Sequence, residues 1–470
     1  MKSFKQHLLY EEQQKNWKEH VEKNPMLKSA ISILKKIEDG GHKAYIVGGA
    51  VRDIISGEQD PHDIDIATNA PMEFLEKEFK THDIGKNKDF GIVVASQDGY
   101  DFEIAHFRND GKYSDGRRPD SVKIVMDFKD DASRRDFTIN AMGIDKEGNI
   151  IDYFDGKKDI KNKILKTVGN AHKRFSEDYL RMLRAIRFST RMGYKIDTDT
   201  KKAIKDNANN IANISSERVF QEIWKMAEKD GSKFADAILE LKDTGLLQYI
   251  FPEVLKTIDL KHSPEHHPEG GVFDHIIEAL RQNKLENPII NLGILFHDLG
   301  KLTTHELKDG KHTYYGHATS AIEIINKIAD RLKMDNETRD ALLFSAENHM
   351  KMHELLQMSP KKVLDLLHNK NWEVLLNVAM SDAKSRKHLF NEKEWQKIMD
   401  RVKEISDKFK GDMNINNIKK VINGEYVMKL RNMKPGKELG EIIKKTLDYI
   451  VNNNININDK EKIEKFIMGA

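Results

Sequence analysis

Residues 45–66 read YIVGGAVRDIISGEQDPHDIDI and place two adjacent glycines directly after a short apolar run. The apolar run, Tyr45–Val47, predicts a buried strand. After Gly48 and Gly49, residues 50–55 are typical of a helix, and the Gly- and Pro-containing segment that follows ends it. A glycine turn before a helix leaves backbone N–H groups open to a phosphate, because no Cβ blocks the approach.

The end of the same stretch carries two aspartates two residues apart. Residues 62–66 predict a second strand, so Asp63 and Asp65 point to one face while Ile64 and Ile66 point into the core. Two carboxylates on one face repel each other unless a cation lies between them, and hard divalent ions such as Mg²⁺ prefer oxygen ligands. The glycines and aspartates together could hold a nucleoside triphosphate and its metals. The alternative is a plain turn followed by a solvated strand edge.

A further pair of carboxylates lies about forty residues later. Residues 100–107 alternate between polar and apolar side chains and predict another strand, with Asp101 and Glu103 on one face. A third carboxylate on a strand beside the two aspartates would complete a two-metal site. An ordinary polar strand face is the alternative.

Two arginines precede an aspartate at Arg134, Arg135 and Asp136. Guanidinium forks bind phosphate, and a carboxylate accepts hydrogen bonds from sugar hydroxyls. The three residues therefore suit a bound nucleotide, although a surface ion pair would give the same pattern.

Residues 177–188 predict one amphipathic helix on which Asp178 and Arg181, three residues apart, are neighbours. An acceptor and a donor fork side by side can pair with the edge of a base. The alternative is an exposed ion pair that contributes a few tenths of a kcal/mol.

Histidines are concentrated in the second half of the chain, where ten of the 19 fall between His262 and His353. His297 and Asp298 stand inside the apolar run 292–300, where two polar side chains are costly unless they bind something. Imidazole together with carboxylate suits a transition metal or Mg²⁺.

The stretch from Gly48 to Asp65 resembles motif A of the nucleotidyltransferase superfamily that includes DNA polymerase β, in the form found in class II tRNA nucleotidyltransferases and bacterial poly(A) polymerases. Residues 134–141 resemble motif B of that family, residues 177–188 resemble motif D, and residues 215–219 with Glu222 resemble the helix-supporting motif E. The resemblance implies catalytic carboxylates that hold two Mg²⁺ ions, Asp63, Asp65 and Glu103. It also implies nucleotide-binding residues near the triphosphate, ribose or base: Gly48, Gly49, Arg52, Arg134, Arg135, Asp136, Asp178, Arg181 and Arg184.

The histidine-rich half resembles the HD phosphohydrolase domain. The order of His, His-Asp and Asp is matched by His275, His297, Asp298 and Asp382. The resemblance implies that these four residues bind one divalent metal, whose identity the pattern leaves open. The segment 422–442 predicts a helix, a Pro-Gly turn and a second helix, and it is similar to the tail of tRNA nucleotidyltransferases that contain an HD domain.

Composition excludes several classes of protein. The chain has 470 residues and no cysteine, so disulfides, cysteine-based zinc sites and thiol catalysis are excluded. Charged residues make up 33% and no apolar run approaches the length of a membrane span, which predicts a cytoplasmic protein without a membrane partner. The net charge of +2 does not by itself indicate a nucleic-acid partner.

The sequence thus predicts an α+β protein. A polymerase-β-like sheet domain should be followed by a helical neck, body, HD domain and tail. The expected division is 1–25 (polar extension), 26–165 (nucleotidyltransferase head), 166–258 (neck and body with the base-recognition helix), 259–388 (HD domain) and 389–470 (RNA-binding tail).

The predicted function is template-independent addition of CMP and AMP to the 3′ end of tRNA from CTP and ATP, with a phosphohydrolase activity in the HD domain. No obligate protein partner is evident. The alternatives are a poly(A) polymerase, an enzyme that adds only CC or only A, an HD nucleotide phosphohydrolase, and an RNA-binding protein with a silent transferase site.

Overall fold

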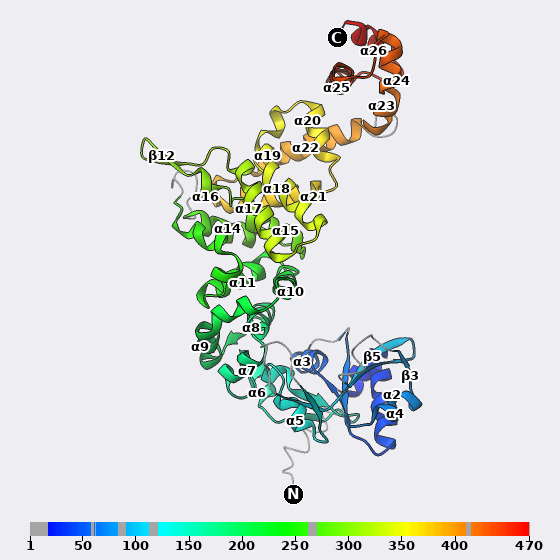
Figure 1. Ribbon diagram of the computed structural model, residues 1–470, viewed down its shortest axis with the longest axis vertical. Coiled ribbons are helices and arrows are strands. Elements are labelled where there is room, and N and C mark those ends of the chain that lie inside the picture. Colours follow the sequence, from blue (N-terminus) through cyan, green and yellow to red (C-terminus); the bar gives the residue numbers. More distant parts are fainter. Residues whose placement is uncertain are drawn as a thin grey trace. The chain divides into compact units, whose positions relative to one another are not determined.

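The computed structural model describes residues 17–57, 61, 63–82, 91–111, 121–261, 270–409 and 415–469, so most of the expected polar extension 1–25 lies outside the described residues. The chain divides into two compact units. One unit comprises Met1–Met226 with Asp236–Ile250, and the other comprises Ala227–Ala235 with Phe251–Ala470. Figure 1 shows the large sheet, in blue and cyan, within the first unit.

The first unit is built on a seven-stranded mixed sheet in the order β3-β4-β5-β2-β1-β8-β9. Only the pair of β2 and β5 is parallel, and its neighbours along the sheet are antiparallel. With the helices of both units, this sheet confirms the predicted α+β class. The strands are β1 Ala44–Val47, β2 Asp65–Thr68, β3 Lys80–His82, β4 Ile92–Gln97, β5 Tyr100–His106, β8 Met142–Ile144 and β9 Ile150–Asp152.

The register of β2 and β5 places two of the expected carboxylates side by side. Ile66 pairs with Ile104, so Asp65 and Glu103, one residue earlier on each parallel strand, are neighbours on one face. The isoleucines are fully buried, as the alternation predicted. The expected strand 62–66 is shorter than predicted, because β2 begins at Asp65 and leaves out Asp63 and Ile64; His62 lies outside the described residues.

Helices pack on this sheet, and a short ribbon extends from it. Helix α2 contacts β1, β4 and β5, and α3 contacts β1 and β8. The side chain of Asn24 accepts a hydrogen bond from the Leu27 backbone N–H at 2.9 Å and so caps α2. The elements are α2 Pro25–Asp39, α3 Gly49–Ser56, α4 Met72–Glu78, α5 Phe128–Ser133 and α6 Gly156–Asn162, with the ribbon β6 Arg108–Asp110 and β7 Val122–Ile124.

The expected single helix over 177–188 is broken at Asp178. Helix α7 covers Ala171–Glu177 and α8 covers Leu180–Met192. Asp178 has extended backbone angles, and its carboxylate accepts a hydrogen bond from the Leu180 N–H at 3.0 Å, which starts the new helix. The other elements of this part are α9 Thr198–Asn207, α10 Ser216–Ala227, α11 Gly231–Asp243, α12 Leu247–Ile250 and the pair β10 Ile164–Leu165 and β11 Lys195–Ile196.

The second unit is helical apart from a short hairpin. At its centre α15 Pro288–Phe296 contacts α14 Val272–Gln282, α18 Asn336–Asn348 and α21 Trp372–Ser385, and α17 His317–Leu332 packs against α18. The remaining elements are α13 Pro252–Lys256, α16 Lys301–Thr304, the hairpin β12 Glu306–Lys308 and β13 Lys311–Thr313, α19 Lys351–Glu354, α20 Pro360–Leu367, α22 Glu392–Lys408, α23 Ile415–Val421, α24 Gly424–Arg431, α25 Lys437–Asn452 and α26 Lys460–Gly469. Within the described ranges, we find no helix with the length and apolar character that a bilayer span requires.

Candidate functional site

The turn between β1 and α3 depends on Gly48. Its φ of 74° lies in a region that side chains other than glycine rarely adopt. A Cβ built there would lie 3.4 Å from Oδ2 of Asp65 and 3.8 Å from Nη1 of Arg135. Bare backbone therefore stands beside a carboxylate and a guanidinium, as a site for a triphosphate with its metals requires.

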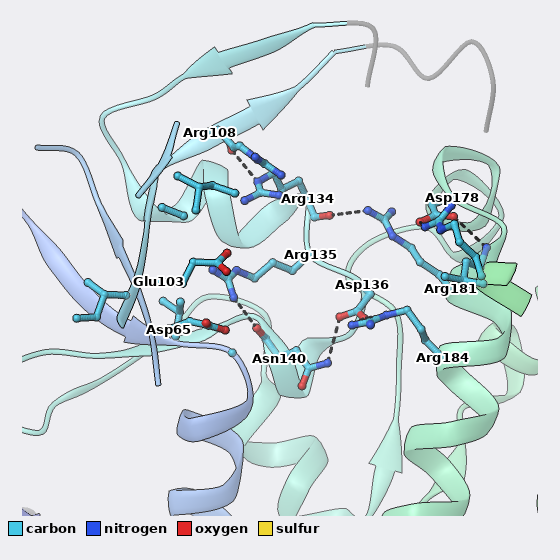
Figure 2. A pocket seen from close by; sticks show the side chains of 17 residues that line it. Asp65, Glu103, Arg108, Arg134, Arg135, Asp136, Asn140, Asp178, Arg181 and Arg184 are labelled. Atoms are coloured by element: carbon cyan, nitrogen blue, oxygen red, sulfur yellow. Dashed lines mark hydrogen bonds and ion pairs between the residues drawn. The ribbon is translucent and has the colours of Figure 1, made fainter. Parts of the chain in front are cut away.

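A pocket of about 430 Å³ opens at this turn (Figure 2). In Figure 2 the carboxylates of Asp65 and Glu103 lie on one side of the pocket, and the residues at the start of α8 lie on the other. The predicted residues that line the pocket are Gly48, Asp65, Glu103, Arg134, Arg135, Asp136, Asp178, Arg181 and Arg184.

Gly49 and Arg52, also expected near the triphosphate, are not among the described residues that line the pocket. The Arg52 guanidinium is instead paired with Asp53 at 2.7 Å and donates to Oδ1 of Asn140 at 2.9 Å. Arg52 thereby tethers α3 to the segment after the two arginines. Its expected contact with a nucleotide remains a prediction.

The carboxylates create a local excess of negative charge. Burial, then Asp63 and Glu103, raise the pKa of Asp65 to about 6, against the opposing effect of Arg135. Asp63 is exposed and precedes the strand. Oxygen ligands that repel one another in this way fit a hard divalent cation, whose charge would remove the repulsion.

The second carboxylate on the β5 face has a different role. The Ser96 hydroxyl of β4 donates a hydrogen bond to Asp101, which does not line the pocket within the described part of the chain. Of the two residues that the alternation left open, Glu103 is thus the neighbour of Asp65.

Asp131, which sequence reasoning missed, holds both arginines of the predicted triad. Its buried carboxylate pairs with Arg134 at 2.7 Å and with Arg135 at 3.1 Å. Burial opposes ionisation, but Arg135 and Arg134 keep the pKa of Asp131 below its ordinary value. The available signal was an aspartate three and four residues before two arginines.

Asp136 is already engaged within the protein. Its Oδ2 accepts two hydrogen bonds from Arg184, at 2.9 and 2.7 Å, and its Oδ1 accepts one from Asn140 at 3.1 Å. Burial opposes ionisation, yet Arg184 and Asn140 hold the pKa of Asp136 at about 2. In this arrangement Asp136 fixes Arg184 at the edge of the pocket.

Asp178 and Arg181 both line the pocket but bind different partners. Asp178 pairs with Arg218 at 3.0 Å, and Arg181 pairs with Glu177 at 2.7 Å. Arg218 lies in the stretch that was expected only to support a helix, and it lines the pocket as well. The supporting role falls to Glu222, whose buried carboxylate pairs with Arg187 of α8 at 2.7 Å.

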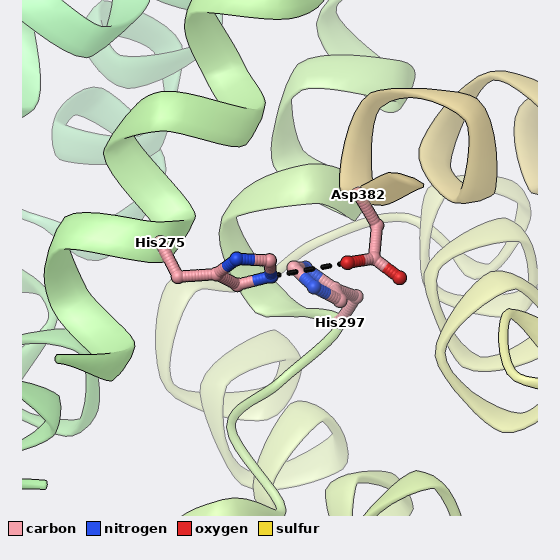
Figure 3. Close-up of side chains that lie close together, drawn as sticks. All are labelled: His275, His297 and Asp382. Carbon is pink, nitrogen blue, oxygen red and sulfur yellow. Dashed lines mark ion pairs between the residues drawn. The ribbon is translucent and has the colours of Figure 1, made fainter. Parts of the chain in front are cut away.

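Two histidines of the second unit meet an aspartate in its interior (Figure 3). His275 of α14, His297 at the end of α15 and Asp382 of α21 are buried, and one ligand atom of each lies within 4.8 Å of the others. Nε2 of His275 is 3.1 Å from Oδ1 of Asp382. Oδ2 of Asp298, the fourth predicted ligand, lies 3.5 Å from Nε2 of His275, so the structure brings all four predicted ligands together.

A second group, Asp298, His317 and His349, satisfies the same distance criterion. Asp298 stands between the groups, because its Oδ1 is 3.4 Å from Nε2 of His317 and its Oδ2 is 3.4 Å from Nε2 of His297. The donor set could hold the single ion expected from sequence, or two ions that share the Asp298 carboxylate. The concentration of histidines was the only sequence signal for His317 and His349.

Backbone carbonyls orient three of these imidazoles for metal binding. Nδ1 lies 2.7 Å from the Ile294 carbonyl in His297, 2.7 Å from the Ala346 carbonyl in His349 and 2.9 Å from the Tyr314 carbonyl in His317. A carbonyl accepts hydrogen bonds, so the neutral ring carries its proton on Nδ1 and turns the Nε2 lone pair inward. Burial lowers the pKa of His349 to about 3, which keeps that ring neutral.

The carboxylates of this cluster are held in their charged form. Burial opposes ionisation, but His297 and Lys301 keep the pKa of Asp298 well below its ordinary value. Lys301 pairs with Asp298 at 2.6 Å. Gly300 allows the close packing around them, because a Cβ there would lie 1.9 Å from the His317 carbonyl oxygen.

Comparison with known sequences gives two family matches. Residues 44–166 match the Poly A polymerase head domain, and residues 193–257 match the probable RNA and SrmB-binding site of polymerase A. A CCA-adding enzyme from Ligilactobacillus salivarius is 36% identical over 374 residues, which cover 73% of this chain and 90% of that protein. One from Lacticaseibacillus paracasei is 48% identical over 203 residues, which cover 43% of this chain and 50% of that protein.

Solved structures give the same result for the whole chain. The CCA-adding enzyme of Bacillus stearothermophilus in complex with CTP is 26% identical, with a TM-score of 0.71, and the match covers 95% of this chain and 97% of that one. The CCA-adding enzyme of Thermotoga maritima complexed with tRNA is 20% identical, with a TM-score of 0.58 and 95% coverage of both chains, and it supports the fold alone.

Proposed function

The chain belongs to the family of CCA-adding enzymes, and on that premise we propose that it adds CMP and AMP to the 3′ end of tRNA from CTP and ATP. One observation carries the proposal: two neighbouring carboxylates, Asp65 and Glu103, face arginines across a pocket that begins at the Gly48 turn. Negative charge for metals and positive charge for a triphosphate are thus available in one place.

In the proposed mechanism Asp63, Asp65 and Glu103 would hold Mg²⁺. Bound Mg²⁺ would favour the ionised 3′-hydroxyl of the RNA and neutralise charge on the leaving pyrophosphate. The Gly48 turn leaves backbone N–H groups for the triphosphate, and Arg134 and Arg135, fixed by Asp131, supply positive charge beside it.

The residues across the pocket suit selection of the base without a nucleic-acid template. Asp178 supplies acceptor oxygens, while Arg181 and Arg184 supply donors at the start of α8. Arg218 and Asp136 fix two of these side chains by the ion pairs described above. We propose that the fixed geometry selects cytosine and adenine by their hydrogen-bonding edges.

A second activity is supported by the histidine cluster. We propose that His275, His297, Asp298 and Asp382, together with His317 and His349, bind a pair of divalent metals and hydrolyse a phosphoester. Water would add to the phosphorus, and the ester oxygen would leave with a proton. A 2′,3′-cyclic phosphate or a phosphate at a damaged RNA 3′ end is the substrate we expect, because its removal exposes the hydroxyl that nucleotide addition needs.

Incubation of the protein with tRNA that lacks its 3′ end, with each single NTP and with CTP plus ATP, tests the transferase proposal. Addition of CCA and then arrest is expected. A long A tail would indicate a poly(A) polymerase, arrest after CC or addition of A alone would indicate a partial enzyme, and no addition would contradict the proposal.

The five-part domain division and a cytoplasmic location also stay proposals. The division has support from the family matches, which end at residues 166 and 257, near two of its predicted boundaries. The lack of cysteine fits a compartment without disulfides.

A further inference from the structure

The metal cluster borders a cavity of about 620 Å³ that lies within the second unit. Besides the ligand candidates, the cavity is lined by cationic side chains, among them Lys301, Lys311 and Arg386, and by Tyr314 and Tyr315. Cations beside a metal pair suit the phosphate of a substrate, but they give no reason for an aromatic wall.

The side chain of Tyr315 lies on the surface and not in the hydrophobic core. Its exposure of 80% is the highest among the large hydrophobic side chains in the described ranges. The Lys308 ammonium of the hairpin lies 5.9 Å from its ring centroid. An exposed aromatic ring at the edge of a cavity offers a flat apolar surface to a ligand that enters the cavity.

The position of Tyr315 relative to the metal cluster is fixed through its neighbours in sequence. The Tyr314 hydroxyl donates to the Lys261 carbonyl at 2.7 Å, and the Tyr314 carbonyl accepts from Nδ1 of His317 at 2.9 Å. Between them Gly316 has a φ of 79°, which turns the chain into α17. One short segment therefore carries both a metal-ligand candidate and the exposed ring.

We propose that Tyr315 stacks on the base of a nucleotide whose phosphate lies at the metal cluster. The site would then take nucleoside phosphates in preference to phosphoesters without a base. Every base has a π-face, so stacking on one ring binds a nucleotide without selecting its sequence. The inference rests on the hydrolase activity proposed above and names its substrate class.

The kinetic test compares two substrates that differ only in the base, adenosine 2′,3′-cyclic phosphate and 1-O-methylribose 2′,3′-cyclic phosphate. Tyr315→Ala should raise KM for the adenosine substrate about tenfold and leave both constants for the base-free substrate unchanged. Tyr315→Phe, which keeps the ring, should behave as the wild type. Tyr249→Ala, a change at another exposed tyrosine in the first unit, is the matched control.

A photochemical test locates the base directly. Ultraviolet crosslinking of 4-thiouridine 3′-phosphate to the full chain should give an adduct in the tryptic peptide 312–327, which contains Tyr315, in addition to any adduct at the transferase pocket. The adduct should be lost in Tyr315→Ala and kept in Tyr249→Ala.

The outcomes separate the two proposals. Hydrolysis of both substrates with unchanged constants in Tyr315→Ala, or no adduct in that peptide, would overturn the stacking inference while leaving the hydrolase intact. If the wild type hydrolyses neither substrate with Mg²⁺, Mn²⁺ or Ni²⁺, the hydrolase proposal fails, and the crosslink alone then decides whether a base binds at Tyr315.

Discussion

The two candidate metal sites of this molecule shift the pKa of their central aspartates in opposite directions. At the sheet, Asp65 lies beside two further carboxylates, and its pKa is raised to about 6. In the helical unit, Asp298 is more deeply buried, yet histidines and Lys301 keep its pKa well below the ordinary value. At the first site burial and the two neighbouring carboxylates outweigh the effect of Arg135 on the pKa of Asp65, whereas at the second site His297 and Lys301 outweigh the effect of burial on the pKa of Asp298.

The comparison indicates that the sheet site depends more than the helical site on a bound cation to offset the charges of its carboxylates. A cation that enters with a triphosphate can remove the repulsion among the carboxylates. An open pocket of this kind suits a substrate that brings its metal with it. Imidazoles held by backbone carbonyls form a ligand set that is organised before the metal binds. The following predictions test the contrast, from the largest effect to the smallest.

Asp65→Asn should reduce nucleotide addition by about a thousandfold or more, because a neutral amide replaces a negatively charged carboxylate that can bind the metal through either oxygen. The measurement is CMP incorporation into truncated tRNA. Asp101→Asn is the matched control, since Asp101 shares a strand and face with Glu103 but lies outside the pocket lining as described.

The metal-free Asp65→Asn protein should melt no lower than the wild type, because the change removes the repulsion between Asp65 and the neighbouring carboxylates. Near wild-type addition by Asp65→Asn would remove Asp65 from the catalytic set.

Asp298→Ala should reduce phosphoester hydrolysis by about a hundredfold or more while addition to intact acceptor ends changes little. The reason is that Asp298 lies between both ligand groups of the second unit and takes no part in the sheet site. Both activities are to be assayed on one preparation, with Asp340→Ala, an exposed carboxylate on α18, as control. Loss of both activities together would indicate that Asp298 supports the fold instead.

Much of the fold at the first site was readable from sequence, because local patterns determine it. Apolar alternation placed Ile64 and Ile66 in the core and put Glu103 on the correct face. The alternation could not choose between Asp101 and Glu103 on one face; the family resemblance favoured Glu103, and the parallel register of β2 and β5 places it beside Asp65. The break at Asp178 was missed because a capping aspartate competes with the helix through its own side chain.

The partners within each site were less predictable, because they depend on contacts between distant segments. Asp178 and Arg181 are neighbours in sequence, yet Asp178 pairs with Arg218, forty residues away. The pair of Asp136 and Arg184 joins the segment after α5 to helix α8. In the second unit, the order of His, His-Asp and Asp indicated four ligands. His317 and His349 could be identified as further ligands only from the packing of α17 against α18.

Arg181→Ala should lower discrimination among NTPs by about tenfold, because a buried donor that pairs with a base edge would be missing. The measurement is misincorporation of UMP and GMP into truncated tRNA. Arg191→Ala, an exposed arginine on the same helix, is the control. A fall in rate with unchanged selectivity would show that Arg181 supports catalysis or stability, as its pair with Glu177 also allows.

The smallest predicted effect is the pH dependence that separates the two metal sites. A protonated carboxyl is a poor metal ligand, and the pKa of Asp65 in the metal-free protein is about 6, above its ordinary value. The affinity of the sheet site should therefore fall as pH decreases through 6, by about fourfold between pH 7.0 and pH 5.5 from the ionised fraction of this one group. His349, whose pKa is about 3, stays neutral over the same range, so its contribution to the helical site should not change. Titration of Mn²⁺ by its paramagnetic signal in Asp65→Asn and in Asp298→Ala isolates each site. Asp298→Ala, which retains the sheet site, should show this fall, whereas Asp65→Asn lacks the carboxyl whose titration causes it. An affinity that stays constant in Asp298→Ala between pH 7.0 and pH 5.5 would contradict the assignment of the effect to Asp65.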